Sequence, residues 1–119
     1  MVRRIVADLP VTDPGVDGPF WSGLLGLAPV FDLGWVVALQ AGTAQVQLVS
    51  RDATAPQDSA VSVEVDGPET LAAVHDEAVR AGYAIVHPLT DEPWGVRRFF
   101  VRTPGGVLVN VLAHAPRES

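Results

Sequence analysis

The chain has 119 residues, close to the commonest size of one compact domain, and 48% of them are hydrophobic while only 18% are charged. A domain this small exposes much surface, so we expect a homodimer in which a second subunit covers part of the apolar surface. The formal net charge of −6 argues against nucleic acid as a partner, and the lack of cysteine excludes disulfides and thiolate nucleophiles. No apolar run approaches the roughly 20 residues of a membrane span, so we predict a cytoplasmic protein with no membrane partner.

The first half of the chain is predicted to contain a strand, a short helix and three more strands. Residues 3–11 alternate loosely as a strand that ends at a turn formed by Asp13 and the two residues after it. Residues 18–26 carry apolar side chains at helical spacing, and Gly26 suits the position just after a helix. Three strand-like runs follow, at residues 28–32, 35–40 and 43–49, with a tight turn at Ala41-Gly42.

The same order repeats in the second half. Residues 51–59 are polar and without periodicity, so they are the expected linker. A strand is predicted over residues 60–66, and a helix follows, with its start at Gly67-Pro68 and its stop at Gly82. The buried stripe of this helix is predicted to consist of Leu71, Val74, Ala78 and Val79. The last three strands are predicted at residues 84–89, 96–102 and 107–113, with a turn at residues 103–106.

This repetition predicts an α+β fold of two βαβββ modules, residues 1–50 and 60–115, within a single domain over residues 1–119. In each module the helix is expected to cover one face of a four-stranded antiparallel sheet, while the other face curves into a cup.

Two segments carry a family resemblance. Residues 93–111 read PWGVRRFFVRTPGGVLVNV and resemble the closing hairpin of the vicinal oxygen chelate superfamily of glyoxalases, bleomycin-resistance proteins and extradiol dioxygenases. Residues 20–27 read FWSGLLGL and are similar to the first helix of these proteins. The resemblance covers nearly the whole chain and implies two βαβββ modules that form a cup, usually in a dimer.

The resemblance also implies where metal-dependent members bind their metal, with one ligand from the first and last strand of each module. Counted from Asp13, these positions fall on Val6 and Gln47 in the first module, and on Ala60 and Asn110 in the second. Alkyl side chains cannot bind a metal, and neutral amides are weak donors for a divalent cation. We therefore expect no metal and no cofactor, and the departure argues against glyoxalase or extradiol dioxygenase activity.

Amide side chains are the first candidates for ligand contacts in the cup. Period-2 alternation places Gln45 and Gln47 on the cup face of their strand, and Leu108, Asn110 and Leu112 on the cup face of the last strand. An amide among apolar neighbours can hydrogen-bond a ligand carbonyl or hydroxyl, although the amides would equally pair with each other or with water. The opposite, core face is predicted to carry Val46, Leu48, Phe99, Val101, Val107, Val109 and Val111.

Aromatic and charged side chains complete the candidate site. Trp94, and to a lesser degree Trp35, would stack on a planar ligand at the mouth of the cup; the alternative is packing or a dimer interface. Alternation sends Arg98 and Phe100 into the cup, with Arg102 at its rim. A guanidinium there would hold a ligand anion. It would equally form an internal salt bridge with one of two inward-pointing acids, which are Asp8 and Glu64.

The histidines form no recognisable metal or nucleophile motif. His75 is predicted on the surface of the second helix, at the edge of its apolar stripe, and His114 near the rim of the cup. His87 has no role that the sequence defines.

The leading hypothesis is a metal-free protein that binds a small aromatic or hydrophobic molecule, for example to sequester an antibiotic or another toxic natural product. The alternatives are a lyase, isomerase, cyclase or dioxygenase-like enzyme on the same fold, with Asp8 or Glu64 as acid or base or with a metal held by His114, and a ligand-free regulatory module. No catalytic residue is identified. The predicted ligand-binding residues are Asp8, Trp35, Gln45, Gln47, Glu64, Trp94, Arg98, Phe100 and Asn110.

Overall fold

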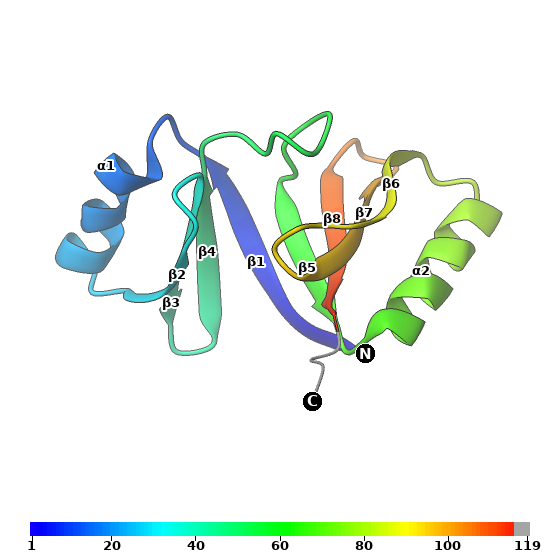
Figure 1. Cartoon of the computed structure of the whole chain (residues 1–119), viewed down its shortest axis with the longest axis horizontal. Coiled ribbons are helices and arrows are strands. Elements are labelled where there is room, and N and C mark those ends of the chain that lie inside the picture. Colours follow the sequence, from blue (N-terminus) through cyan, green and yellow to red (C-terminus); the bar gives the residue numbers. More distant parts are fainter. Residues whose placement is uncertain (116–119) are drawn as a thin grey trace. The chain divides into compact units, whose positions relative to one another are not determined.

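The computed structural model describes residues 1–115, which form two α-helices, one π-helix and eight strands (Figure 1). The elements are β1 (Val2–Pro10), α1 (Pro14–Pro19), the π-helix η1 (Phe20–Leu24), β2 (Ala28–Asp32), β3 (Val36–Ala41), β4 (Ala44–Val49), β5 (Val61–Val65), α2 (Pro68–Arg80), β6 (Ile85–Asp91), β7 (Val96–Arg102) and β8 (Leu108–His114). Most strand boundaries lie within one or two residues of the predicted ones. None of the helices within residues 1–115 has the length and apolarity that crossing a membrane requires.

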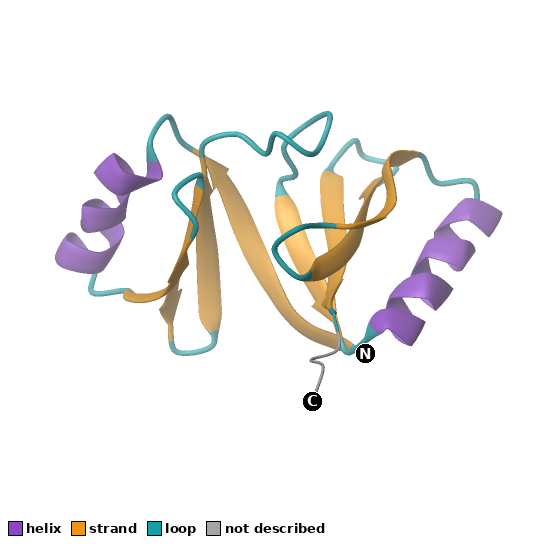
Figure 2. Ribbon diagram, in the orientation of Figure 1, coloured by secondary structure: helices purple, strands orange, loops and turns teal. Residues whose placement is uncertain are grey.

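The chain divides into two compact units, one over Val6–Asp58 and one that joins Met1–Ile5 to the chain from Ser59 onward. Strand β1 therefore begins in one unit and ends in the other. The strand order is β2-β3-β4-β1 in the first module and β5-β8-β7-β6 in the second (Figure 2). In both orders the first strand of the module lies beside its last strand. This confirms the predicted α+β fold of two βαβββ modules.

The sheets are mixed, and the prediction of antiparallel sheets was wrong. Strand β1 pairs with β4 in parallel, and β5 pairs with β8 in parallel, whereas the other paired strands within each module are antiparallel. The reason lies in the connections. The helix carries the chain back, so the second strand of the module runs in the direction of the first, and two hairpin reversals bring the fourth strand into that same direction.

The first helix begins earlier than predicted. The side chain of Asp13 accepts a hydrogen bond from the backbone N–H of Gly15 at 2.9 Å, so the predicted turn is the N-cap of α1, with Pro14 at the first helical position. Pro19 lies inside the helix and has no N–H to donate, and the chain continues from there as the π-helix. The helical segment ends at Gly26, whose φ of 76° requires glycine, as predicted.

The core of the second unit lies between α2 and one face of the sheet. Leu71 and Ala78 pack into a buried cluster that contains Phe99 of β7 and Val111 of β8, with Val74 against it. Two residues expected in the core are exposed: Val79 is 55% exposed, and Val107 is 46% exposed. Val79 lies beyond the narrow helix face that touches the strands, and Val107 precedes β8 in the turn.

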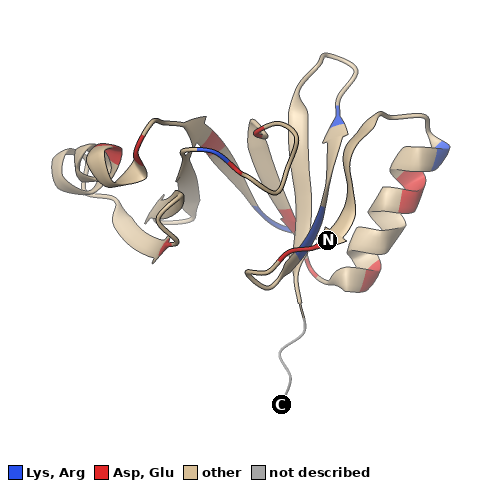
Figure 3. Cartoon of the chain, turned by 45° about the horizontal axis from the view of Figure 1, so that its top comes forward, with Lys and Arg blue, Asp and Glu red and all other residues tan. Residues whose placement is uncertain are grey.

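The outer surface of α2 carries much of the negative charge of this unit (Figure 3). Exposed acidic residues along the helix are Glu69, Asp76 and Glu77. At the start of the helix, the hydroxyl of Thr70 stabilises the Asp66 carboxylate and lowers its pKa below the ordinary value.

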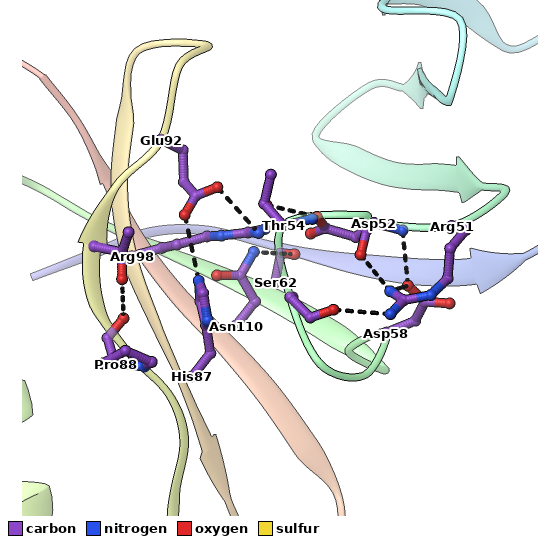
Figure 4. Close-up of polar contacts among 12 residues, drawn as sticks. Arg51, Asp52, Thr54, Asp58, Ser62, His87, Pro88, Glu92, Arg98 and Asn110 are labelled. Atoms are coloured by element: carbon purple, nitrogen blue, oxygen red, sulfur yellow. Dashed lines mark hydrogen bonds and ion pairs between the residues drawn. The ribbon is translucent and has the colours of Figure 1, made fainter.

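The predicted linker is an ordered loop held by its own side chains (Figure 4). The Arg51 guanidinium bonds the Asp58 carboxylate at 3.2 Å and the Ala55 carbonyl at 2.8 Å. The Asp52 carboxylate accepts from the N–H and the hydroxyl of Thr54, at 3.1 and 2.8 Å. These bonds satisfy polar groups that a loop without helix or strand would leave unpaired.

Candidate functional site

A set of buried polar residues of the second unit lies on the sheet face opposite to α2. His87, Phe100, Asn110 and Ser62 are register partners in turn, so they form one row across β6, β7, β8 and β5. Side chains of register partners point to the same face of a sheet. A parallel row on this face contains Thr90, Arg98, Leu112 and Glu64. The predicted alternation of β7 and β8 is therefore confirmed for the residues from Arg98 to Val101 and from Leu108 to Leu112.

The amide of Asn110 has one partner and one spare polar atom. Its Nδ2 donates to Ser62 Oγ at 3.1 Å, and both residues are buried, whereas no hydrogen bond reaches its Oδ1 in the described structure. A hydroxyl can donate as well as accept, so turning the amide over would leave the other amide atom unpaired instead. A buried polar atom without a partner costs about 1–3 kcal/mol. The row therefore contains one position where a ligand atom would relieve that cost.

A buried carboxylate joins His87 to Arg98 (Figure 4). The Oε1 atom of Glu92 lies 3.3 Å from His87 Nε2, and its Oε2 atom lies 3.5 Å from an Nη atom of Arg98. The side chains are 9%, 2% and 4% exposed for His87, Glu92 and Arg98, respectively. Charges removed from water to this extent need opposite charges beside them, and Glu92 supplies one for Arg98.

The sequence pattern did not predict the positions of His87 and Glu92, for different reasons. Plain alternation would put His87 on the core face together with Ile85 and Leu89, which pack against the core. The register of β6 shifts on both sides of His87, next to Pro88, and this brings the imidazole to the face of Phe100 instead. Proline within a strand was the sequence signal for such a bulge. Glu92 lies in the β6–β7 connection, where alternation predicts nothing.

The aromatic side chains of this face hold Arg98. Its guanidinium carbon lies 4.9 Å from the ring centroid of Trp94 and 4.8 Å from that of Phe100, and His87 meets Phe100 edge-on at 5.3 Å. A guanidinium within about 6 Å of a ring face is stabilised by it. Phe100 is only 1% exposed, so a ligand could stack on it only if Arg98 or His87 moved. Trp94 remains partly exposed.

The negative charge of Glu64 is balanced by cationic side chains of its own unit. Its Oε1 atom accepts from Arg4 Nε at 2.6 Å and lies 3.4 Å from His114 Nε2, and Arg3 approaches its Oε2 atom at 4.0 Å. Glu64 does form an internal salt bridge, but its close partner is Arg4, whereas the prediction offered Arg98 or Arg102. The rim position predicted for His114 agrees with its exposed side chain at the end of β8.

The first unit brings three of the remaining candidates onto one sheet face. Asp8 and Val6 of β1 are the register partners of Gln47 and Gln45 of β4, and Asp8 is buried while both glutamines are half-buried. Trp35 lies before β3 rather than in it, and its carbonyl accepts from the N–H and hydroxyl of Ser50, at 2.9 and 3.0 Å.

A family model, described as the Glyoxalase/Bleomycin resistance protein/Dioxygenase superfamily, matches residues 6–111. The chain belongs to this superfamily. Among curated proteins no match was found.

Solved structures of three other proteins have similar folds. A Legionella pneumophila protein described as an NAD-dependent benzaldehyde dehydrogenase matches with a TM-score of 0.79 and 16% identity, over 92% of this chain and 98% of that one. A glyoxalase/bleomycin resistance protein/dioxygenase superfamily member from Vibrio splendidus 12B01 matches with a TM-score of 0.64 and 22% identity, over 95% of this chain and 99% of that one. A hypothetical protein from Bacillus halodurans C-125 matches with a TM-score of 0.68 and 17% identity, over 100% of this chain and 97% of that one. At these identities the likeness extends to the fold alone.

The positions that the superfamily resemblance implies for metal ligands carry no side chains suited to a divalent cation. Val6 is a buried alkyl side chain, Ala60 is a methyl group before β5, and Asn110 is tied to Ser62. Among residues 1–115, no three His, Cys, Asp or Glu side chains gather as a metal site would require. The donors that remain, two neutral amides, bring no charge to a divalent cation. That these positions share one hollow stays a prediction.

Proposed function

We propose that this chain binds a small organic molecule through hydrogen bonds and apolar contacts rather than through a metal ion. One observation carries the proposal. Where the superfamily resemblance implies a carboxylate ligand, Asn110 presents a buried amide with a spare polar atom. A neutral amide is suited to a hydroxyl, carbonyl or amide of a ligand.

The surroundings of Asn110 favour a ligand that enters without a charge and has an apolar body. The buried charges of this unit already have partners, with Arg98 on Glu92 and Arg4 on Glu64. A ligand charge placed among them would have to disturb an existing pair. Ligand sites of this kind are mostly apolar with few polar groups, and an aromatic natural product that the protein sequesters is the concrete form of the proposal.

A thermal-shift screen with planar aromatic natural products tests this proposal. A compound that binds only the folded chain should stabilise it by about 2.7 kcal/mol at roughly 100 times its Kd, which appears as a rise in Tm. We expect Asn110→Leu to abolish the rise for that compound, because it removes the amide and leaves an apolar side chain of similar size. Gln40→Leu is the matched control, because it removes an exposed amide at the end of β3.

Two results would contradict the proposal. One is the absence of any stabilising compound in a broad aromatic panel. The other is a rise in Tm with manganese, zinc or ferrous salts that a chelator reverses, because it would mean that the amides and other donors hold a metal after all.

An enzyme of the same superfamily is the second candidate. The observation in its favour is the buried pair of His87 and Glu92, because an imidazole held by a carboxylate is a common proton-transfer group. Glu64, which the sequence favoured as an acid or base, is held between Arg4 and His114.

We also propose that a second copy of the chain covers apolar side chains of the first unit. The large exposed apolar residues of that unit are Val16, Phe20, Leu24, Leu25, Val30 and Leu33. We expect light scattering after size exclusion to give twice the mass of one chain, and Leu24→Arg to give the monomer mass, since a charge cannot be buried there without a partner. Val79→Arg, at an exposed position of α2, is expected to leave the dimer intact. A monomeric wild type, or a dimer unchanged by Leu24→Arg, would contradict this interface.

A further inference from the structure

The hydrogen bond between His87 and Glu92 determines which nitrogen of His87 carries the proton. Nε2 lies 3.3 Å from the Glu92 carboxylate, which can only accept, so a neutral imidazole places its N–H on Nε2. The lone pair is then on Nδ1. In the described part of the chain, no hydrogen bond reaches Nδ1. His87 therefore presents an unprotonated nitrogen as an acceptor.

Glu92 is the charged group in contact with His87. Its carboxylate lies against Nε2 of His87 and also faces Arg98. The other charged or titratable groups of this face lie at other register positions, namely Glu64 with Arg4 and His114, and Arg102 at the end of β7.

His87 and Asn110 lie on either side of the same residue. Both are register partners of Phe100, on the strands next to it, so their Cα atoms are separated by two strand spacings of about 4.8 Å each. A molecule of the size of one or two aromatic rings spans such a distance once Arg98 has moved away from the Phe100 ring, which it covers. The row thus offers an amide at one end and a proton acceptor at the other.

We propose that His87 accepts a proton from a weakly acidic O–H group of the ligand, which makes a phenol or an enol the ligand class. This inference rests on the proposed binding function. The ligand O–H bond breaks, the proton goes to Nδ1, and the electron pair stays on the ligand oxygen. The Nε2 proton stays on the imidazole and is donated in a hydrogen bond to the Glu92 carboxylate, which offsets the new positive charge, and the imidazolium forms an ion pair with the oxyanion. No oxidant or cofactor is needed.

The first test uses para-nitrophenol, whose ionised form absorbs visible light. At a pH below the pKa of the free phenol, we expect wild-type protein to bind it and to increase the phenolate absorbance. His87→Gln keeps an N–H that can reach Glu92 but has no basic nitrogen. We expect this variant to lower the ratio of bound phenolate to bound phenol about tenfold or more, which corresponds to about one unit in the apparent pKa of the bound phenol. His75→Gln is the matched control. His75 lies on α2 against Phe99, on the other side of the sheet from His87, so this variant should bind and ionise the phenol as the wild type does.

The second test does not depend on a ligand or on a variant that folds. Nitrogen NMR of the wild type should find neutral His87 protonated at Nε2, and the Nδ1–H tautomer would overturn the inference. A phenolate signal that His87→Gln leaves unchanged would overturn it too. If no phenol binds while non-acidic aromatic compounds raise Tm, this inference fails and the proposed function stands. If neither class of compound binds, both fail.

Discussion

Glu92→Gln is expected to lower the free energy of unfolding by about 3–5 kcal/mol, the typical result of removing one member of a buried ion pair. The carboxylate is 2% exposed and lies between His87 and Arg98. An amide keeps the volume of the side chain but removes its charge, so the Arg98 guanidinium is left without the carboxylate beside it. Urea denaturation followed by tryptophan fluorescence measures the change, and Trp94 lies against Arg98.

Asp91→Asn is the matched control for this experiment. Asp91 precedes Glu92 in the chain and lies 3.6 Å from Arg97, but its side chain is 84% exposed. Exposed ion pairs contribute only about 0–1 kcal/mol, so a small change is expected. Equal effects of the two substitutions would mean that the Glu92 carboxylate is not buried against Arg98 as the structure has it.

Phe99→Ala is expected to destabilise the chain by about 3–5 kcal/mol, because it leaves a cavity in the core of the second unit. Phe99 is fully buried among Leu71, Ala78 and Val111, and its ring meets His75 edge-on at 4.9 Å. A loss of this size is a large part of the stability of a small domain. Phe99→Leu is a milder variant that keeps most of the packing, and it allows the trend to be measured if the alanine variant does not fold.

Tyr83→Ala provides the comparison for the core variant. Tyr83 is 47% exposed just after α2 and lies outside the apolar surface proposed for the dimer, so removing its ring should change the unfolding free energy by only a fraction of the Phe99 effect. The prediction is contradicted if both variants lose the same stability. The free energies of unfolding are compared by chemical denaturation of both variants and the wild type at the same protein concentration, since the unfolding midpoint of a dimer depends on concentration.

Local patterns predicted the elements well. The strand over Val96–Arg102 and the strand over Ala28–Asp32 have the predicted bounds, and α2 lies between Gly67 and Gly82 as expected. Proline at the first helical position and glycine after the last turn are properties of the backbone, so they are readable without knowing the neighbours. The two segments that resemble the superfamily led to the family that the match over residues 6–111 confirms.

Contacts between distant segments were predicted less well. Alternation placed Asn110 and Arg98 on the polar face, but it could not show that Ser62 bonds the amide, or that Arg98 pairs with Glu92. It could not place His87, because bulges in β6 break the period of two. The partners of Glu64 come from β1 and the end of β8, and nothing in the spacing of Arg4 or His114 indicates this.

The amino-acid sequence alone determined the βαβββ repeat and the superfamily, and it predicted amides at two of the four metal-ligand positions. These depend on residue type, on period and on motifs within short segments. Only the tertiary structure decided which polar groups are paired, because register, bulges and the approach of distant strands select each partner. The spare atom of Asn110, on which the proposed function depends, and the acceptor nitrogen of His87, on which the further inference depends, are therefore consequences of the folded sheet.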